Sequence, residues 1–185
     1  SDRMLHFLEN HDEQRIASPE FAGYAEKAKP AMVVSTLISE SPVMVYFGQE
    51  VGERAAEWAG FGSPSRTSIF DYIGVPAHQG WVNGKRYDGG GLTPEQASLR
   101  DFYCRLLRLP IKGNFQNIHR YNREHTSYYN DKVYSFVRET AHTKWLIIAN
   151  FSKHDGFGFE LQVPPELLST WDLPNGSYPL VDKLY

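Results

Sequence analysis

The chain has 185 residues, of which 41% are hydrophobic and 22% are charged, and its formal net charge is −3. This composition is typical of a globular protein and argues against a disordered chain, a nucleic-acid surface or a polybasic membrane patch. No apolar stretch reaches the length of a membrane span, and a single cysteine, Cys104, excludes an internal disulfide and leaves the cellular compartment open.

The first 50 residues predict a strand, a helix and a second strand. Residues 4–8 form a short apolar run that predicts a buried strand, and the helix follows over residues 30–40 with a proline in its first turn. Residues 43–47 ("VMVYF") are continuously apolar, as in a strand buried on both faces. The short connections predict a βαβ unit with parallel strands and a right-handed crossover.

Polar runs follow both predicted strands. "ENHDEQR" comes directly after the first strand and "GQEVGE" directly after the second. In βαβ units, functional residues gather beyond the carboxyl ends of the strands. The two runs therefore predict a pocket at this edge.

Residues 48–93 form a long, glycine-rich segment that we expect to be irregular and functional, because its aromatic content argues against disorder. Its Trp58, Tyr72, Trp81 and Tyr87 are suited either to stack on sugar rings or to fix the segment to the rest of the fold, and the sequence does not decide between these roles.

The clearest predicted helix covers residues 94–109, with Thr93 as N-cap, a proline at the first position and Gln96 at the third. Beyond it the period changes. The runs "KVYSFVRE", "KWLIIANFS", "GFGFELQV" and "SYPLVDKLY" predict antiparallel strands. We therefore divide the chain into residues 1–112 and residues 113–185.

In combination, these segments resemble the α-amylase family of glycoside hydrolases. "FLENHDEQR" is similar to the family's Asn-His-Asp segment at the seventh barrel strand, and "SPVMVYFGQEVGE" is similar to its eighth-strand segment. The helix at 94–109 resembles the last barrel helix, and the strands after it resemble the start of the following β-sandwich. The resemblance implies that residues 1–112 are the C-terminal segment of a (β/α)₈ TIM barrel. It likewise implies that residues 113–185 are an antiparallel β-sandwich domain, incomplete at its end.

The resemblance also implies a chemistry and a substrate. The family cleaves α-glucosidic bonds in starch or maltodextrin by the retaining route. By this matching Asp12 stabilises the oxocarbenium-like transition state, His11 binds the sugar, and Arg15 binds substrate or positions the loop against nearby acidic groups. Glu50 takes a structural role at the end of the second strand.

The family's nucleophile and general acid, and its first six barrel strands, have no counterpart in this sequence. We therefore expect a C-terminal portion of an amylase-like enzyme that is inactive by itself. Two barrel strands without the others would expose apolar faces, which predicts self-association through residues 4–8 and 43–47. Many family members hold calcium, but no acidic cluster with ligand spacing occurs here, so no metal or cofactor is predicted.

Three alternatives stay open. The chain could belong to a catalytically inactive amylase homologue, or it could be a non-catalytic carbohydrate-binding protein, although the latter leaves the βαβ unit with its polar strand ends unexplained. Asn-His-Asp also occurs in metallophosphatases, which need further Asp and His ligands. The remaining histidines show no ligand-like spacing: His78, His119, His125, His142 and His154.

Overall fold

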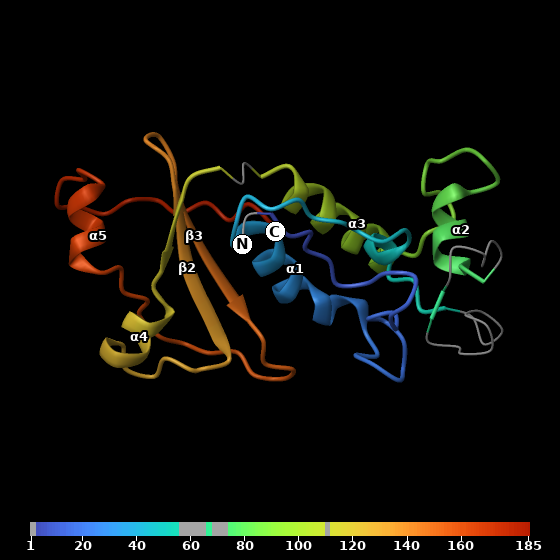
Figure 1. The fold of residues 1–185 in the computed structure, drawn as a ribbon, viewed down its shortest axis with the longest axis horizontal. Helices are drawn as coiled ribbons and strands as arrows, with labels where there is room; N and C mark the ends of the chain where they lie inside the picture. The colour runs from blue at the N-terminus through green and yellow to red at the C-terminus, as the bar shows by residue number, and fades with distance from the viewer. Residues whose placement is uncertain (1–2, 56–65, 68–73, 110–111) are drawn as a thin grey trace.

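The computed structural model describes residues 3–55, 66–67, 74–109 and 112–185 (Figure 1). Within these residues no helix is both long and apolar enough to cross a membrane. Short 3₁₀ turns occur at Ala25–Ala28 and Gln49–Val51. The helices and strands in chain order are α1 (Lys29–Leu37), α2 (Pro76–Val82), α3 (Pro94–Leu107), β1 (Asn114–Asn117), α4 (His119–His125), β2 (Val133–Glu139), β3 (Lys144–Asn150) and α5 (Pro165–Thr170).

Within the described residues, the N-terminal segment pairs with the segment after α1 in parallel, as predicted, but through one bridge. Residues 43–47 are half-buried and form no continuous strand, so the prediction of a strand buried on both faces is wrong there. His6 and Val43 form this bridge. The backbone N–H of His6 donates to the carbonyl of Pro42, and that of Met44 donates to the carbonyl of His6, both at 2.9 Å. The His6 ring also lies 2.8 Å from the carbonyl of Ser35 in α1. These contacts place α1 beside the two segments it connects.

The prediction of a buried strand over residues 4–8 is wrong. Met4, Leu5 and Phe7 expose 63%, 47% and 41% of their surface. A buried strand needs neighbouring strands and a covering layer, and within the described residues this segment has one bridge partner, Val43, at one position. The apolar sequence therefore predicted an extended segment here, but it did not show whether other parts of the fold cover that segment.

The helix α3 is confirmed together with its predicted cap. The Gln96 backbone N–H donates to the Thr93 hydroxyl at 3.3 Å, and the Thr93 backbone N–H donates to the Gln96 side chain at 2.9 Å. This reciprocal capping box satisfies two amide groups that an isolated helix end leaves unpaired. The buried face of α3 then joins the core.

A three-stranded antiparallel sheet has the order β1-β2-β3, and β2 and β3 pair along their whole length. The sequence predicted β2 and β3 but not β1, α2, α4 or α5, and α2 lies within the segment that was expected to be irregular. Residues 156–163 alternate between half-buried apolar and exposed side chains as expected, yet they form no strand. Residues 177–185 are mostly exposed and also form no strand. Alternation reports which side chains face inward, whereas a strand also needs a free edge to pair with.

The main core joins both predicted parts of the chain. Met32 of α1, Leu99 and Phe102 of α3, Phe136 of β2 and Ile147 of β3 belong to one buried cluster. In Figure 1, α1 and α3 lie on one side of the sheet, and α4 and α5 lie on the other. The barrel segment and the β-sandwich both stay predictions, because one parallel bridge and one three-stranded sheet are common to many architectures.

Candidate functional site

The polar run after the first bridge begins with a tight turn made by Asn10. Its side-chain oxygen accepts hydrogen bonds from the backbone N–H groups of Asp12 at 2.8 Å and Glu13 at 2.9 Å. Asparagine is favoured at this position because its side chain can imitate a backbone turn. The turn directs His11 and Asp12 outward.

His11 and Asp12 lie side by side at the surface. The Nε2 atom of His11 is 3.2 Å from Oδ2 of Asp12, and the two side chains expose 53% and 69% of their surface. A carboxylate and an imidazole at this exposure can both reach a ligand from solvent. The structure thus brings together two of the three side chains that the sequence singled out.

Arg15, the third predicted residue, lies in the interior. Its side chain has 0% exposure, and its Nη1 atom donates to Oε2 of Glu9 at 2.9 Å. Its Nε atom donates to the hydroxyl of Thr67 at 2.7 Å. The other oxygen of Glu9 accepts from the backbone N–H of Ile16 at 2.7 Å. In this arrangement Arg15 contacts a nearby acid and fixes the loop, and its role in direct substrate binding stays a prediction.

Two aromatic rings and an unpaired nitrogen complete the surroundings of Arg15. The guanidinium carbon lies 4.5 Å from the ring centre of Tyr46 and 5.0 Å from that of Phe47. Such contacts stabilise a desolvated cation. The Nη2 atom is buried without a hydrogen-bond partner among the described residues. Burial raises the pKa of the Glu9 carboxyl above its usual range, and the charge of Arg15 opposes that rise.

The turn after residue 47 supplies the second half of this buried layer. Gly48 has a φ of +84°, and a Cβ atom there would lie 2.9 Å from Cβ of Glu53. Only glycine tolerates both the backbone conformation and the close approach. The turn brings Gln49 inward, where its amide donates to the hydroxyl of Tyr103 at 3.0 Å. Gln49 thereby ties the turn to α3.

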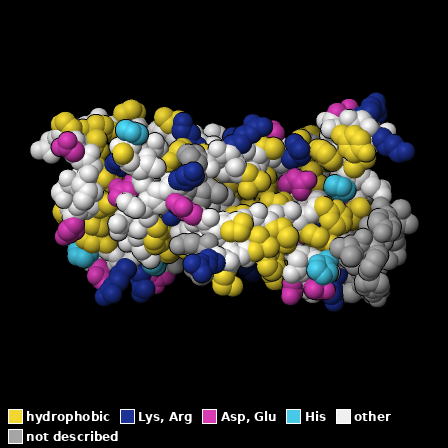
Figure 2. Space-filling view, turned by 45° about the horizontal axis from the view of Figure 1, so that its top comes forward, with side chains coloured by type: hydrophobic (Ala, Val, Ile, Leu, Met, Phe, Trp, Pro, Cys, Tyr) yellow, Lys and Arg dark blue, Asp and Glu magenta, His cyan; other side chains and the backbone are white. Residues whose placement is uncertain are grey.

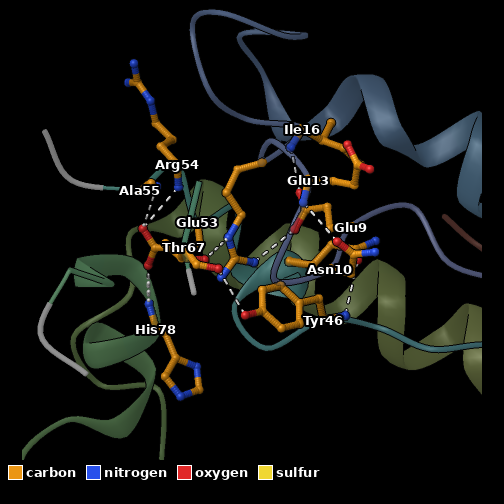
Figure 3. A network of polar contacts seen from close by, with 12 residues as sticks. Glu9, Asn10, Glu13, Ile16, Tyr46, Glu53, Arg54, Ala55, Thr67 and His78 are labelled. Atoms are coloured by element: carbon orange, nitrogen blue, oxygen red, sulfur yellow. Dashed lines mark hydrogen bonds and ion pairs between the residues drawn. The ribbon is translucent and has the colours of Figure 1, made fainter. Parts of the chain in front are cut away.

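Glu53 is a second buried carboxylate in this layer, with 1% of its surface exposed. One oxygen accepts from the backbone N–H of Arg54 at 3.0 Å, and the other accepts from that of His78 in α2 at 3.0 Å. Figure 3 shows this network of contacts around Glu9 and Glu53. Gln49 and Glu53 hold this layer together, and the structural role of their neighbour Glu50 stays a prediction.

The aromatic side chains proposed as sugar platforms differ from one another. Trp81 stacks on His78 with ring centres 6.0 Å apart, lies 5.9 Å from Tyr87 and is covered by the guanidinium of Arg100 at 5.2 Å. These contacts favour a structural role for Trp81. Tyr87 keeps 59% of its surface exposed. Trp58 and Tyr72 lie outside the described residues.

The described residues contain no cluster of side chains suited to bind a metal ion. No group of three or more His, Cys, Asp or Glu side chains there could hold a metal ion. His11 and Asp12 have no third such partner in that part of the chain. The metallophosphatase alternative thus receives no support from these residues.

Comparison with known proteins identified no related protein. No protein-family model, curated protein or solved structure matched the chain. The site must therefore be interpreted from its own geometry.

The sequence did not single out Glu9 or Glu53 as buried carboxylates. For Glu9 a signal was present in the sequence. It directly follows an apolar run and lies six residues before Arg15, so a buried ion pair between Glu9 and Arg15 was compatible with the sequence. For Glu53 no local signal separates it from Glu50, since both follow the same apolar strand.

Proposed function

We propose that this chain supplies the sugar-binding and transition-state-stabilising side of an α-glucan hydrolase of the retaining, amylase-like type. Asp12 is the stabilising carboxylate, and His11 binds a hydroxyl of the same sugar. No nucleophile or general acid is assigned to this chain. The 185 residues alone are therefore expected to bind glucan without cleaving it.

The observation that carries the proposal is an exposed pair, His11 and Asp12, in the same short run as a buried ion pair. The exposed pair has its side chains 3.2 Å apart and open to solvent. The ion pair of Glu9 and Arg15 in that run is closed to solvent. A surface turn with no function would not need a buried ion pair, since such pairs contribute little net stability over apolar packing.

The chemistry follows from where the charge develops. In glycoside cleavage the sugar ring gains positive charge in the transition state. A carboxylate held near that ring interacts more strongly with the transition state than with the bound sugar, and only such a difference accelerates the reaction. Asp12 has the charge and the exposure for this task, and the turn made by Asn10 holds its backbone in place.

Arg15 and Glu9 act as positioning residues in this account. Arg15 connects the loop to Thr67, and Glu9 connects it to Ile16. Four hydrogen-bonded or aromatic contacts on one guanidinium limit the conformations of residues 9–16. A loop held in this way keeps His11 and Asp12 oriented before substrate arrives, which lowers the entropy cost of binding.

The test is hydrolysis of maltooligosaccharides by the intact enzyme to which the proposal assigns these 185 residues, followed by NMR of the newly formed reducing end. The proposal expects cleavage with the α configuration retained in the first product. Binding of maltooligosaccharides without cleavage would favour the carbohydrate-binding alternative. Inversion of configuration, or no interaction with α-glucans, would contradict the proposal.

A further inference from the structure

A hollow lies at the C-terminal end of α4. It has a volume of about 440 Å³, within the range of about 300–1,000 Å³ typical of small-molecule sites. One wall is formed by residues 125–128 and the other by residues 159–162. Figure 1 places α4 and α2 at opposite ends of the molecule, with α2 next to the buried layer around Glu53.

The two walls are fixed to each other by one buried side chain, Asn122. Its amide nitrogen donates to the carbonyl of Gln162, and its amide oxygen accepts from the backbone N–H of the same residue, both at 2.8 Å. The same oxygen accepts from the hydroxyl of Thr126 at 2.8 Å. A hollow whose walls share such a connection exists before any ligand arrives.

Tyr128 stands out on the first wall. Its surface is 89% exposed, and its φ of +63° lies in the left-handed region that costs a residue with a side chain about 1 kcal/mol. The next residue, Tyr129, is anchored by hydrogen bonds from its hydroxyl to the carbonyl of Val133 at 2.9 Å and with Ser135 at 3.0 Å. The backbone conformation and the anchored neighbour thus place the Tyr128 side chain at the surface beside the hollow.

The lining chemistry selects the class of ligand. An exposed aromatic ring offers a flat apolar face, and Glu160 and Gln162 across the hollow offer a carboxylate and an amide. A sugar matches both, since its C–H groups pack on an aromatic ring while its hydroxyls donate to carboxylate and amide oxygens. No Lys or Arg is among the described residues that line the hollow, and Glu160 repels anions, so phosphorylated ligands and nucleic acids are disfavoured.

We propose that this hollow is a second carbohydrate-binding site, which holds one or two sugar units of a glucan chain against Tyr128. The choice of an α-glucan as the carbohydrate rests on the proposed function. The site has no catalytic group of its own. It would keep a long polysaccharide attached to the protein while another part of the same chain reaches His11 and Asp12, which raises the effective concentration of substrate.

The experiment is affinity electrophoresis of the full chain in gels that contain glycogen, with isothermal titration of maltoheptaose and of cellohexaose. Tyr128→Ala is expected to weaken maltoheptaose binding about tenfold, whereas Tyr128→Phe keeps the ring and should bind like the wild type. Glu160→Ala tests the opposite wall and should also weaken binding. Tyr178→Ala is the matched control, because Tyr178 is 49% exposed and does not line the hollow.

The outcomes separate this site from the proposed function. Glucan binding that is unchanged in both Tyr128→Ala and Glu160→Ala would overturn the second site and leave the assignment of Asp12 untouched. Loss of binding in Tyr128→Ala but not in Asp12→Asn would support it. Binding of cellohexaose alone, dependent on Tyr128, would support a carbohydrate site here while contradicting the α-glucan assignment. Circular dichroism of each variant confirms that the fold is retained.

Discussion

The guanidinium of Arg15 donates to the carboxylate of Glu9 at 2.9 Å in a place where neither side chain is accessible to solvent. Both residues belong to the run of polar side chains that also contains the exposed His11 and Asp12. One short stretch thus sends Glu9 and Arg15 inward and His11 and Asp12 outward. The inward pair supports the turn that presents the outward pair.

Breaking the buried pair from one side should destabilise the protein strongly. Arg15→Met leaves the Glu9 carboxylate buried without its partner, and the free energy of unfolding is expected to fall by about 3–5 kcal/mol. The double variant Glu9→Gln with Arg15→Met should recover part of that loss, because no charge is left buried. Urea unfolding followed by circular dichroism measures both. Equal stability of Arg15→Met and wild type would show that the pair does not hold the loop.

Tyr103 should make the protein sensitive to alkali. Burial raises the pKa of its hydroxyl above the usual value near 10. The unfolded chain releases this proton above about pH 10 while the folded chain keeps it, so stability is complete below pH 10 and falls as the pH rises further, by at most about 1.4 kcal/mol per pH unit. Tyr103→Phe removes this dependence. Its unfolding free energy should start lower, since Gln49 loses a partner, but should decline less between pH 9 and pH 11.

That comparison has a simple control. Tyr128→Phe alters an exposed hydroxyl and should leave the decline above pH 10 as it is in the wild type. If Tyr103→Phe and the wild type lose stability in parallel over this range, the hydroxyl of Tyr103 is not protected by burial.

The exposed apolar side chains near the N-terminus predict self-association. Met4, Leu5 and Phe7 lie in a segment whose only bridge partner within the described residues is Val43, and Figure 2 shows hydrophobic side chains gathered over the middle of one face. Sedimentation velocity should show oligomers that increase with protein concentration. Leu5→Lys should shift the population toward monomer.

The matched control for that prediction is Leu180→Lys, which changes another exposed leucine in the C-terminal region. Its sedimentation should equal that of the wild type. A monomer at every concentration, or an equal effect of both substitutions, would contradict association through the N-terminal segment.

Local signals were enough to predict the elements whose structure depends on local contacts. The cap of α3 requires only Thr93 and Gln96, three residues apart, and it formed as expected. The strands β2 and β3 are consecutive and pair with each other, so their alternation was sufficient. For residues 4–8 the sequence could report apolar character but not the number of neighbours, which depends on the rest of the fold.

In the candidate site, too, features set by local contacts were easier to predict than features set by distant contacts. The sequence predicted a polar run at the end of the first segment, and Asn10 closes a turn there through groups only two and three residues away. The burial of Arg15 was not predictable, since its contact with Thr67 spans 52 positions of the chain. Within this run of seven polar residues, no local signal marks Arg15 as a side chain that turns inward. The contact between Arg15 and the distant Thr67 accounts for the burial of Arg15.

The most direct test of the central claim is the turnover of maltooligosaccharides by Asp12→Asn in the protein that carries this sequence. Because the lost charge acts mainly in the transition state, kcat should fall about 100-fold or more while KM changes little and the fold is retained. Glu13→Gln is the matched control, since it neutralises the neighbouring exposed carboxylate, and it should keep turnover close to that of the wild type. A kcat for Asp12→Asn equal to that of Glu13→Gln would contradict the account.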